Sequence, residues 1–520
     1  MTDASHDFRS ILWPDGAAAA RASDDVREPD CFHDLNLDQV VAAIDTAWPG
    51  EHLVPFFRLP ARDVATITWR QDVLRDLERA PLRLAVATFV ERLREMREHL
   101  ARIEKLYYPV EKQRAHLGAA GIYCAAVQAF SDDLAKLQPA STGLRQWHAR
   151  LSDYAASAAF RTLCSECQGV LAALDAIRYD LLVRAGSVAV RPYADETDAS
   201  SAVEATFAKF RPDAGSKARP RPRGRLGFNG LNHIEAQVLD KVVMLNPKPF
   251  SMLDAFCDGH DEFIDPTLDR FTREVCVYLA WHAFIEPLGQ AGLDFCFPEV
   301  DADARAIEAA DTFDIALAAK RVAGHQAVVR NEFALQEGER ILVVTGPNHG
   351  GKTTSARTFG QLHWLAALGL TVPGTRARLM LFDQLFTHFE RAESVETLRG
   401  KLKDDLVRIH AILEHATVHS LIVMNEIFSS TTLDDALALG RRVMTRLSNL
   451  GALAVCVTFL TELADFDAHT VSMVAGVDPS DPAIRTFKVT RRPADGLAYA
   501  LAVANKHRVT REWLLRRIAP

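Results

Sequence analysis

The sequence contains no uncharged apolar run close to the roughly 18 residues that a membrane-spanning helix requires. Apolar residues still make up 48% of the 520 positions, which is typical of a globular chain with a substantial core. The first ten residues, MTDASHDFRS, also lack the basic region and long apolar core of a signal peptide. We therefore expect no membrane contact and a cytoplasmic location, associated with the nucleoid if the source is bacterial.

Cysteine is scarce, with eight residues dispersed over the whole chain. This number and spacing exclude a dense disulfide framework in a protein of this length. Cys164 and Cys167 form one Cys-x-x-Cys pair, but neither a second pair nor a nearby histidine completes a metal site. We therefore expect reduced thiols, either buried or at the surface.

An excess of positive charge is also missing, because 68 Asp and Glu against 60 Lys and Arg give a formal net charge of −8. A nucleic-acid contact would therefore need a local basic patch. Residues 209–225, KFRPDAGSKARPRPRGR, form the one candidate that we identify, a basic loop rich in proline and glycine. It is either a solvated linker or a strip that contacts backbone phosphates without reading base sequence.

The chain before residue 300 shows mainly helical periodicity. Residues 1–32 have mixed charge and little periodicity, which predicts a flexible N-terminal tail. Residues 33–300 are expected to form a mostly helical region, except for a β-hairpin at residues 177–192. One predicted helical face comprises Phe89, Leu93, Met96, Leu100, Ile103 and Tyr107.

Residues 301–520 have a different pattern, in which short apolar runs alternate with helical segments. Such runs are typical of buried strands in a βα arrangement, so we predict an α/β domain here. The predicted strands are Ile341–Thr345, Ala377–Phe386, Ser420–Met424 and Ala452–Thr458.

A glycine-rich motif follows the first of these predicted strands. The segment GPNHGGKT, residues 346–353, fits the pattern GxxxxGK[ST] between a strand and a helix. In such a loop the backbone N–H groups and the positive end of the helix face phosphate oxygens. Lys352 would reach the β and γ phosphates, and the Thr353 hydroxyl would bind magnesium. His349 is interpreted as a loop side chain rather than a catalytic base.

A second polar pair ends the predicted strand Ser420–Met424. Glu426 is the candidate catalytic residue, because a carboxylate at this position can orient or deprotonate an attacking water. Asn425 precedes it and offers a carbonyl oxygen without charge, so we expect it to hold magnesium through water, more weakly than an aspartate would.

These motifs resemble the MutS ATPases of DNA mismatch repair and their relatives. TGPNHGGKTT matches that family's TGPN-x-GGK-[ST]-T loop, and LIVMNEIFSSTTLDDALAL is similar to its LVLMDEIGRGTSTYDGLAL segment. VTFLTEL is similar to ATHxxEL, and GLAYALAVANKHRV to the closing GLAVAxLAGxP. The resemblance covers residues 325–515 and extends more faintly to residues 53–77.

The resemblance implies an ABC-type P-loop ATPase domain at the C-terminus, preceded by a helical lever and clamp. It implies ATP and Mg²⁺ as cofactors, and a homodimer in which each nucleotide lies between two subunits. The ATP-binding residues carried over are Asn331, Gly346, Pro347, Asn348, His349, Gly350, Gly351, Lys352, Thr353 and Thr354. Gly400, Thr431 and Asp435 would face the partner subunit.

The chain departs from the family pattern at four places. Asn425 replaces the aspartate that holds magnesium, and Phe459 replaces a histidine that could hydrogen-bond the γ phosphate. Gly400 stands where the family has its signature serine, if the spacing to Glu426 is kept. The mismatch-reading N-terminal domain and its Phe-x-Glu motif are not recognisable. These departures weaken the expectation of mismatch recognition more than the expectations of ATP binding and dimerisation.

Two functions therefore remain open, and both use the same ATP site. The first is a MutS-like DNA-associated ATPase, whose nucleotide state moves paired helical arms on duplex or branched DNA, largely independently of base sequence. The second is an ATP-gated dimeric scaffold, which hydrolyses ATP weakly and holds a protein partner instead of mismatched DNA. A small-molecule kinase is disfavoured, because the NEIFSSTT segment and the closing motif indicate the ABC-type arrangement.

Overall fold

The computed structural model describes residues 8–14, 26–184, 187–194, 231–390, 401–481, 484–494 and 510–518. The chain forms two compact units, one mainly helical and one with α/β architecture. The helical unit comprises Met1–Phe8, Ala80–Pro139 and Arg145–Thr272. The α/β unit comprises Arg9–Arg79, Ala140–Leu144 and Arg273–Pro520. The units therefore interleave along the chain, whereas the sequence predicts three consecutive regions with boundaries after residues 32 and 300.

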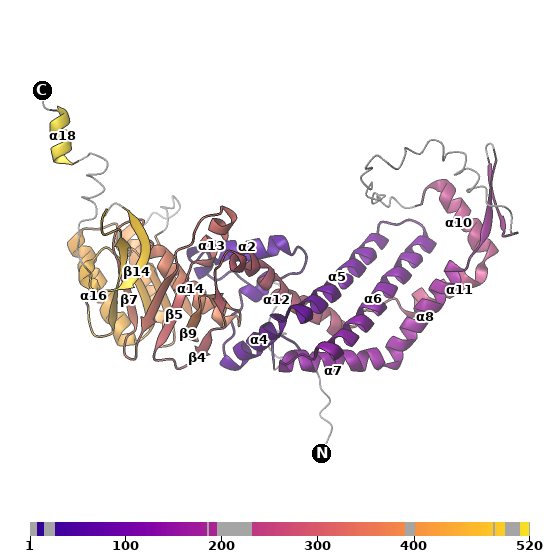
Figure 1. Ribbon diagram of the computed structural model, residues 1–520, viewed down its shortest axis with the longest axis horizontal. Helices are drawn as coiled ribbons and strands as arrows, with labels where there is room; N and C mark the ends of the chain where they lie inside the picture. The colour runs from indigo at the N-terminus through magenta and orange to yellow at the C-terminus, as the bar shows by residue number, and fades with distance from the viewer. Residues whose placement is uncertain are drawn as a thin grey trace, which may run out of the picture. The chain divides into compact units, whose positions relative to one another are not determined.

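The helical unit is built around two long helices, α5 and α6, which lie side by side (Figure 1). Aromatic rings fill its core: Phe89 of α5 stacks on Phe130 of α6 with centroids 4.4 Å apart, and Trp147 stacks on Phe271 at 3.8 Å. The helices of this unit are α5 (Ala80–Ile103), α6 (Pro109–Leu137), most of α7 (Thr142–Ala156), α8 (Ala158–Asp175), α10 (His233–Leu245), α11 (Pro247–Gly259) and the start of α12 (Pro266–Gln290).

The predicted apolar face of α5 is confirmed for Phe89, Leu93 and Met96, which are all buried. It is wrong for Tyr107, whose side chain is 89% exposed. The reason is that α5 ends at Ile103, and the chain turns before Pro109 starts α6, where proline fits the first helical position.

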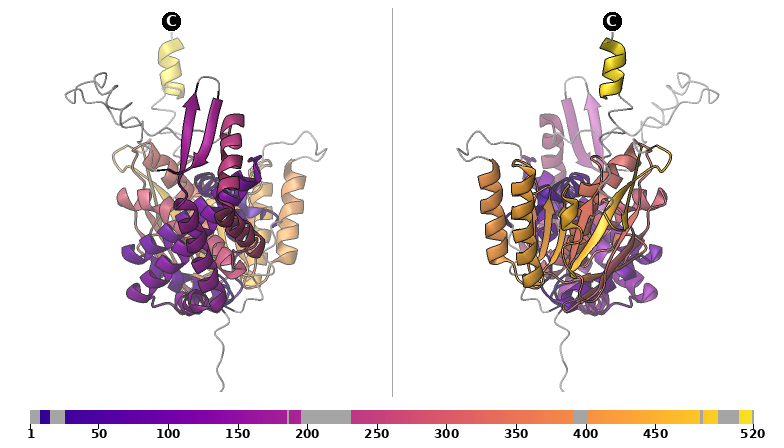
Figure 2. Two further views of the ribbon diagram at one scale, coloured as in Figure 1. Left: turned by 90° about the vertical axis from the view of Figure 1, so that its right-hand side faces the viewer. Right: turned by 90° about the vertical axis from the view of Figure 1, so that its left-hand side faces the viewer.

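The predicted hairpin is confirmed as two antiparallel strands, β1 (Tyr179–Arg184) and β2 (Ser187–Pro192). Their register pairs Tyr179 with Pro192 and Arg184 with Ser187. Helix α10 lies beside this hairpin (Figures 1 and 2). The basic segment 209–225 lies outside the described residues.

A six-stranded sheet forms the centre of the α/β unit, in the order β10-β11-β12-β7-β13-β14. All neighbouring pairs are parallel except β13 and β14. All residues of β7, β11 and β12 are buried, as expected for parallel strands covered on both faces. The strands are β7 (Ile341–Thr345), β10 (Leu385–His388), β11 (Leu421–Asn425), β12 (Leu453–Val457), β13 (Thr470–Val477) and β14 (Arg485–Arg491).

One predicted strand, Ala377–Phe386, is wrong. The structure divides it between β9 (Arg376–Met380) and β10, which belong to different sheets. Asp383 lies between them, and its carboxylate accepts hydrogen bonds from the hydroxyls of Thr417 and Ser420. These bonds keep the pKa of Asp383 below its usual value, although partial burial alone would raise it. A polar turn fixed in this way interrupts the apolar run.

Two smaller sheets complete the unit. One has the order β4-β9-β5-β6, and the other pairs β3 with β8. Their remaining strands are β3 (Phe295–Cys296), β4 (Glu299–Asp301), β5 (Ile307–Thr312), β6 (Asn331–Leu335) and β8 (Val372–Pro373). The other helices of the unit are α1 (Cys31–Asp34), α2 (Leu37–Ala47), α3 (Val54–Phe57), α4 (Val64–Leu77), α13 (Ile315–Ala323), α14 (Lys352–Ala367), α15 (Lys401–His415), α16 (Leu433–Leu450), η3 (Thr461–Leu463) and α18 (Arg511–Ile518).

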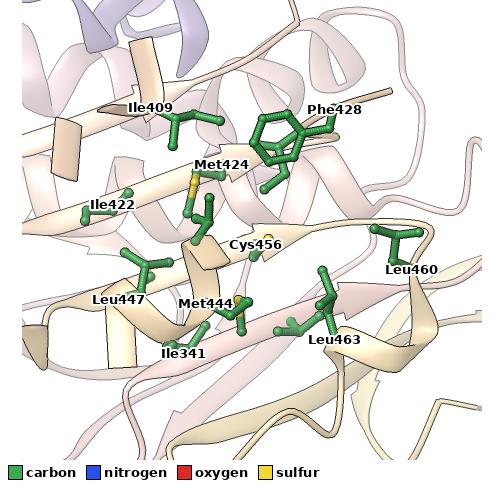
Figure 3. Packing of buried hydrophobic residues seen from close by; sticks show 14 of the residues in the cluster. Ile341, Ile409, Ile422, Met424, Phe428, Met444, Leu447, Cys456, Leu460 and Leu463 are labelled. Atoms are coloured by element: carbon green, nitrogen blue, oxygen red, sulfur yellow. The ribbon is translucent and has the colours of Figure 1, made fainter. Parts of the chain in front are cut away.

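Helices α15 and α16 lie on one face of the six-stranded sheet (Figure 2). Alternate strand residues such as Ile341, Ile422 and Cys456 point into this layer, where they meet Met444 and Leu447 of α16 (Figure 3). The period of two along the strands, combined with the apolar stripe of α16, explains this packing. Helix α14 packs against the same strands outside this cluster and covers the other face.

The later turns of α14 contact residues from the beginning of the chain. Gln361 donates a hydrogen bond to the carbonyl of Leu35 at 2.8 Å, and the indole of Trp364 donates to the carbonyl of Phe57 at 2.9 Å. A Cβ atom on Gly360 would lie only 2.7 Å from the Leu35 side chain. Leu35 and Phe57, which both precede α4 in the chain, are therefore part of the α/β core.

The described parts of segment 1–32 differ from the flexible tail that the sequence predicts. Phe8 is buried, with its ring centroid 5.1 Å from that of Trp147. Ile11 and Leu12 are also buried, and the carbonyl of Ile11 accepts a hydrogen bond from Trp69 at 2.9 Å. Large apolar side chains, few but well spaced, hold this segment in place although it has no regular periodicity.

No described helix is both long and apolar enough to cross a membrane. All eight cysteines are free thiols, as the sequence predicts. Among the residues that the structure covers, no group of three or more His, Cys, Asp or Glu side chains is arranged to hold a metal ion, so Cys164 and Cys167 do not belong to such a group.

Candidate functional site

A pocket of about 550 Å³ lies in the α/β unit, beside the loops that follow β7 and β11. In a parallel sheet this edge, at the carboxyl ends of the strands, is the usual place for a ligand. The residues around the pocket are Leu317, Arg321, Val329, Asn331, Asn348, His349, Gly350, Gly351, Lys352, Thr353, Thr354, Glu426 and Phe487. Nine of the predicted site residues are among them: Asn331, Asn348, His349, Gly350, Gly351, Lys352, Thr353, Thr354 and Glu426.

The glycine-rich loop between β7 and α14 requires glycine for its backbone shape. Gly346 has a φ of +120°, and a Cβ atom there would lie 2.8 Å from the carbonyl oxygen of Ala475. Gly351 has a φ of +96° and starts α14 without a side-chain cap. The first N–H groups of α14 therefore have no side-chain acceptor from the capping residue, and they carry the positive end of the helix dipole. Such a loop can hold an anionic group such as phosphate.

Lys352 is buried at the first position of α14 and supplies the positive charge of the loop. Its Nζ donates hydrogen bonds to the carbonyls of Gly346 at 2.8 Å and Pro347 at 3.4 Å. Burial lowers the pKa of the Lys352 ammonium to about 8. Gly346 and Pro347 do not line the pocket and act on it through this lysine.

Phe459, which follows β12, lies directly over the same ammonium group. The Nζ atom of Lys352 is 4.0 Å from the centroid of the Phe459 ring, within the range of a cation–π interaction. The sequence singles out Phe459 only as a replacement for histidine and does not predict this contact. Adjacency of β12 and β7 in the sheet brings the two residues together.

Thr353 and Asn425 form a second polar group at the site. The Thr353 hydroxyl donates a hydrogen bond to Oδ1 of Asn425 at 2.8 Å, across 72 positions of sequence. These two oxygens are ligands of the type that Mg²⁺ prefers, and Mg²⁺ commonly keeps several waters. The residues present therefore fit a hydrated magnesium ion, with the charge supplied by other groups.

Glu426 is half-buried at the pocket, immediately after β11. Its backbone has a left-handed φ of 56°, and its N–H donates to the carbonyl of Val457 at 2.8 Å. A non-glycine residue in this region costs free energy, and such residues cluster at functional sites. The hydrogen bond to Val457 at the end of β12 holds Glu426 in this conformation.

Asn331 joins two strands beside the pocket. Its side-chain amide donates to the carbonyl of Phe487 at 3.1 Å and accepts from the N–H of Val489 at 2.8 Å. It thereby ties β6 to β14 and fixes the position of Phe487, whose side chain is 41% exposed. The sequence does not predict four residues of the pocket, because no motif marks them and only the fold brings them there: Leu317, Arg321, Val329 and Phe487.

Thr431 and Asp435 lie at the start of α16 and do not line this pocket. The Thr431 hydroxyl is 3.5 Å from a carboxylate oxygen of Asp435, which also accepts a hydrogen bond from the Thr432 hydroxyl at 2.9 Å. Gly400 lies outside the part of the chain that the structure describes.

The part of the chain that matches known proteins lies in the α/β unit. Residues 342–512 match the family model for MutS domain V. The endonuclease MutS2 of Thermus thermophilus is 31% identical over 193 residues, which cover 36% of this chain and 25% of that protein. The endonuclease MutS2 of Thermomicrobium roseum is 34% identical over 176 residues, covering 33% of this chain and 22% of that protein.

A third relative is a DNA mismatch repair protein. The DNA mismatch repair protein MutS of Listeria monocytogenes serotype 4b is 30% identical over 190 residues, which cover 36% of this chain and 22% of that protein. The matched region thus spans about a quarter or less of these relatives. The family model covers the glycine-rich loop, Glu426 and α16, so the α/β domain of this chain is similar to domain V of MutS proteins.

Proposed function

We propose that this chain binds and hydrolyses ATP in the pocket of the α/β unit, as a MutS-like protein associated with DNA. The observation that carries the proposal is the meeting of three groups at one pocket. These are the glycine-rich loop with Lys352, the Thr353–Asn425 pair, and Glu426. Each has the chemistry that a different part of a metal-bound triphosphate needs.

The phosphates would lie along the loop, where the N–H groups of residues 348–353 can donate to their oxygens. Lys352 would donate to the β and γ phosphates on the side of Nζ that the loop carbonyls leave open. Thr353 and Asn425 would hold Mg²⁺, directly or through water, and the ion neutralises charge on the phosphates. Glu426 would accept a proton from the attacking water.

Other residues around the pocket suit the nucleoside part of the ligand. Phe487, Leu317 and Val329 provide apolar surface for a base, and Arg321 adds hydrogen-bond donors.

Nucleotide affinity should depend on pH through Lys352. Its pKa of about 8 in the free protein means that the ammonium loses its proton above that pH, whereas bound phosphate favours the charged form. Affinity for ADP should therefore change little between about pH 7 and 8 and then fall by up to about tenfold per pH unit. Isothermal titration calorimetry with ADP from about pH 7 to about pH 10 tests this expected pH dependence. A flat profile up to about pH 10, the ordinary range of a lysine, would contradict the assignment.

DNA association is the second part of the proposal, and we propose that a homodimer carries it. Support comes from the DNA mismatch repair proteins among the relatives and from the seven basic residues in segment 209–225. Phosphate contacts make affinity fall linearly with salt on logarithmic axes, with a slope of about 0.9 per contact in duplex DNA. Binding should be largely independent of base sequence.

Fluorescence anisotropy with a labelled duplex, in ATP and magnesium, tests this interface. Changing Arg219, Arg221 and Arg223 together to glutamine should reduce the salt slope by about 0.9 for each DNA phosphate that the protein no longer neutralises. Arg305→Gln is the matched control, because Arg305 is an exposed arginine of the α/β unit, and it should leave the slope unchanged. No detectable DNA binding at low salt would reject this part of the proposal.

An ATP-gated scaffold with weak hydrolysis is the second candidate. Two observations favour it: the neutral Asn425 beside Thr353, and the apolar Phe459 over Lys352. In that case nucleotide would bind without measurable turnover, and the helical unit would hold a protein partner. Single-turnover hydrolysis separates the two candidates.

A further inference from the structure

The ammonium group of Lys352 has a full set of partners before any ligand arrives. Its Nζ atom donates two hydrogen bonds, to the carbonyl oxygens of Gly346 at 2.8 Å and Pro347 at 3.4 Å. The Phe459 ring lies at 4.0 Å and supplies the electron-rich face of an aromatic system as a third partner. Phosphate oxygens can reach this lysine only if at least one of these contacts is replaced.

Phe459 is held in this place by its neighbours and not by burial of its own ring. Its side chain is 48% exposed. The preceding residue, Thr458, donates its N–H to the carbonyl of Val344 at 3.1 Å, and the following residue, Leu460, is 6% exposed in the core. Backbone bonding on one side and core packing on the other therefore fix the position from which the ring extends.

The Phe459 ring blocks access to the ammonium of Lys352, but it cannot itself form a hydrogen bond with a phosphate. Phenylalanine has no hydrogen-bond donor, so it offers nothing to a phosphate oxygen. A terminal phosphate that binds Lys352 has to approach the face of Nζ that the ring covers, because the other two directions point to the loop carbonyls.

We propose that Phe459 is an aromatic latch, which keeps Lys352 turned onto its own loop and lowers the affinity of the pocket for nucleotides with a β or γ phosphate. This inference rests on the proposed ATP site and adds a residue that tunes it. Before a phosphate can bind, the cation–π contact has to break and the Phe459 ring has to turn away. Both steps cost free energy, and this cost weakens phosphate binding. A nucleoside monophosphate, whose single phosphate does not extend to Lys352, would bind without opening it.

Calorimetric titration of the full chain with Mg·ADP and with AMP tests the latch. Phe459→Leu keeps apolar bulk but removes the aromatic face, and Phe459→Ala removes both. We expect both variants to bind ADP about 2- to 30-fold more tightly than the unaltered chain, the range that corresponds to one cation–π contact. AMP affinity should stay unchanged. Because the Phe459 side chain is half exposed, circular dichroism and thermal unfolding should show an intact fold.

Phe487→Leu is the matched control, since it replaces another partly exposed aromatic ring, one that lines the pocket and does not cover Lys352. It should weaken ADP and AMP alike. Equal ADP affinity of the unaltered chain and Phe459→Leu would overturn the latch, and so would weaker ADP binding by either Phe459 variant. If the unaltered chain and both Phe459 variants bind no nucleotide, the proposed function fails first. If only the variants bind, the latch is supported in its strongest form.

Discussion

Lys352→Ala is expected to weaken ADP and ATP binding by at least about 30-fold, and by up to several thousand-fold. The reason is that alanine removes the buried positive charge that the β and γ phosphates would contact. Truncating one partner of a buried charge pair costs about 2–5 kcal/mol, because the other charge is left without compensation. Calorimetry at pH 7.5 to 8 measures the effect, since Lys352 is still partly or mostly charged there.

Lys403→Ala provides the comparison for this variant. Lys403 is an exposed lysine on α15 of the same unit, and it does not line the pocket. Its replacement should leave nucleotide affinity within experimental error. If Lys352→Ala binds ADP as well as the unaltered chain does, the loop is not the phosphate site, and the proposals for Thr353, Glu426 and Phe459 lose their common basis.

Glu426→Gln is expected to reduce the single-turnover rate of ATP hydrolysis by about 10²- to 10⁴-fold while ATP still binds. Glutamine keeps the size of the side chain and its hydrogen-bonding oxygen, but it cannot accept the proton of the attacking water. General-base catalysis typically contributes a factor of this size. Rapid mixing of excess protein with radiolabelled ATP and magnesium isolates the chemical step from product release.

Glu337→Gln is the control for the loss of a carboxylate. Glu337 forms an exposed ion pair with Arg305 away from the pocket, and such pairs have little influence on stability. It should hydrolyse ATP at the unaltered rate. A Glu426→Gln variant that turns over normally would exclude Glu426 as the base, whereas no turnover by the unaltered chain would favour the scaffold function.

The sequence predicts those features that are encoded locally. The strands β7, β11 and β12 are continuous apolar runs, and the hairpin β1–β2 has turn residues between two short strands. The glycine-rich loop is also local, because its shape depends on glycines at fixed spacing. These elements agree with the structure to within one or two residues at each end.

Features that depend on distant contacts are not predicted. The run Ala377–Phe386 looks like one strand until Thr417 and Ser420 fix Asp383 in a turn. No motif marks Leu317, Val329 and Phe487 as neighbours at the pocket, since β6 and β14 belong to different sheets and meet only in the folded unit. The contact of Phe459 with Lys352 likewise depends on the order of β12 and β7.

Helix α14 links the pocket to the beginning of the chain, and this arrangement limits which truncated forms of the protein can keep the pocket intact. Its first turn carries Lys352, while Gln361 and Trp364 further along bond the backbone of Leu35 and Phe57. An excised fragment that spans only residues 342–512 would expose the groove where Leu35 sits and leave both donors without acceptors. A truncation intended to retain the nucleotide site should therefore keep the first 79 residues attached or supply them in trans.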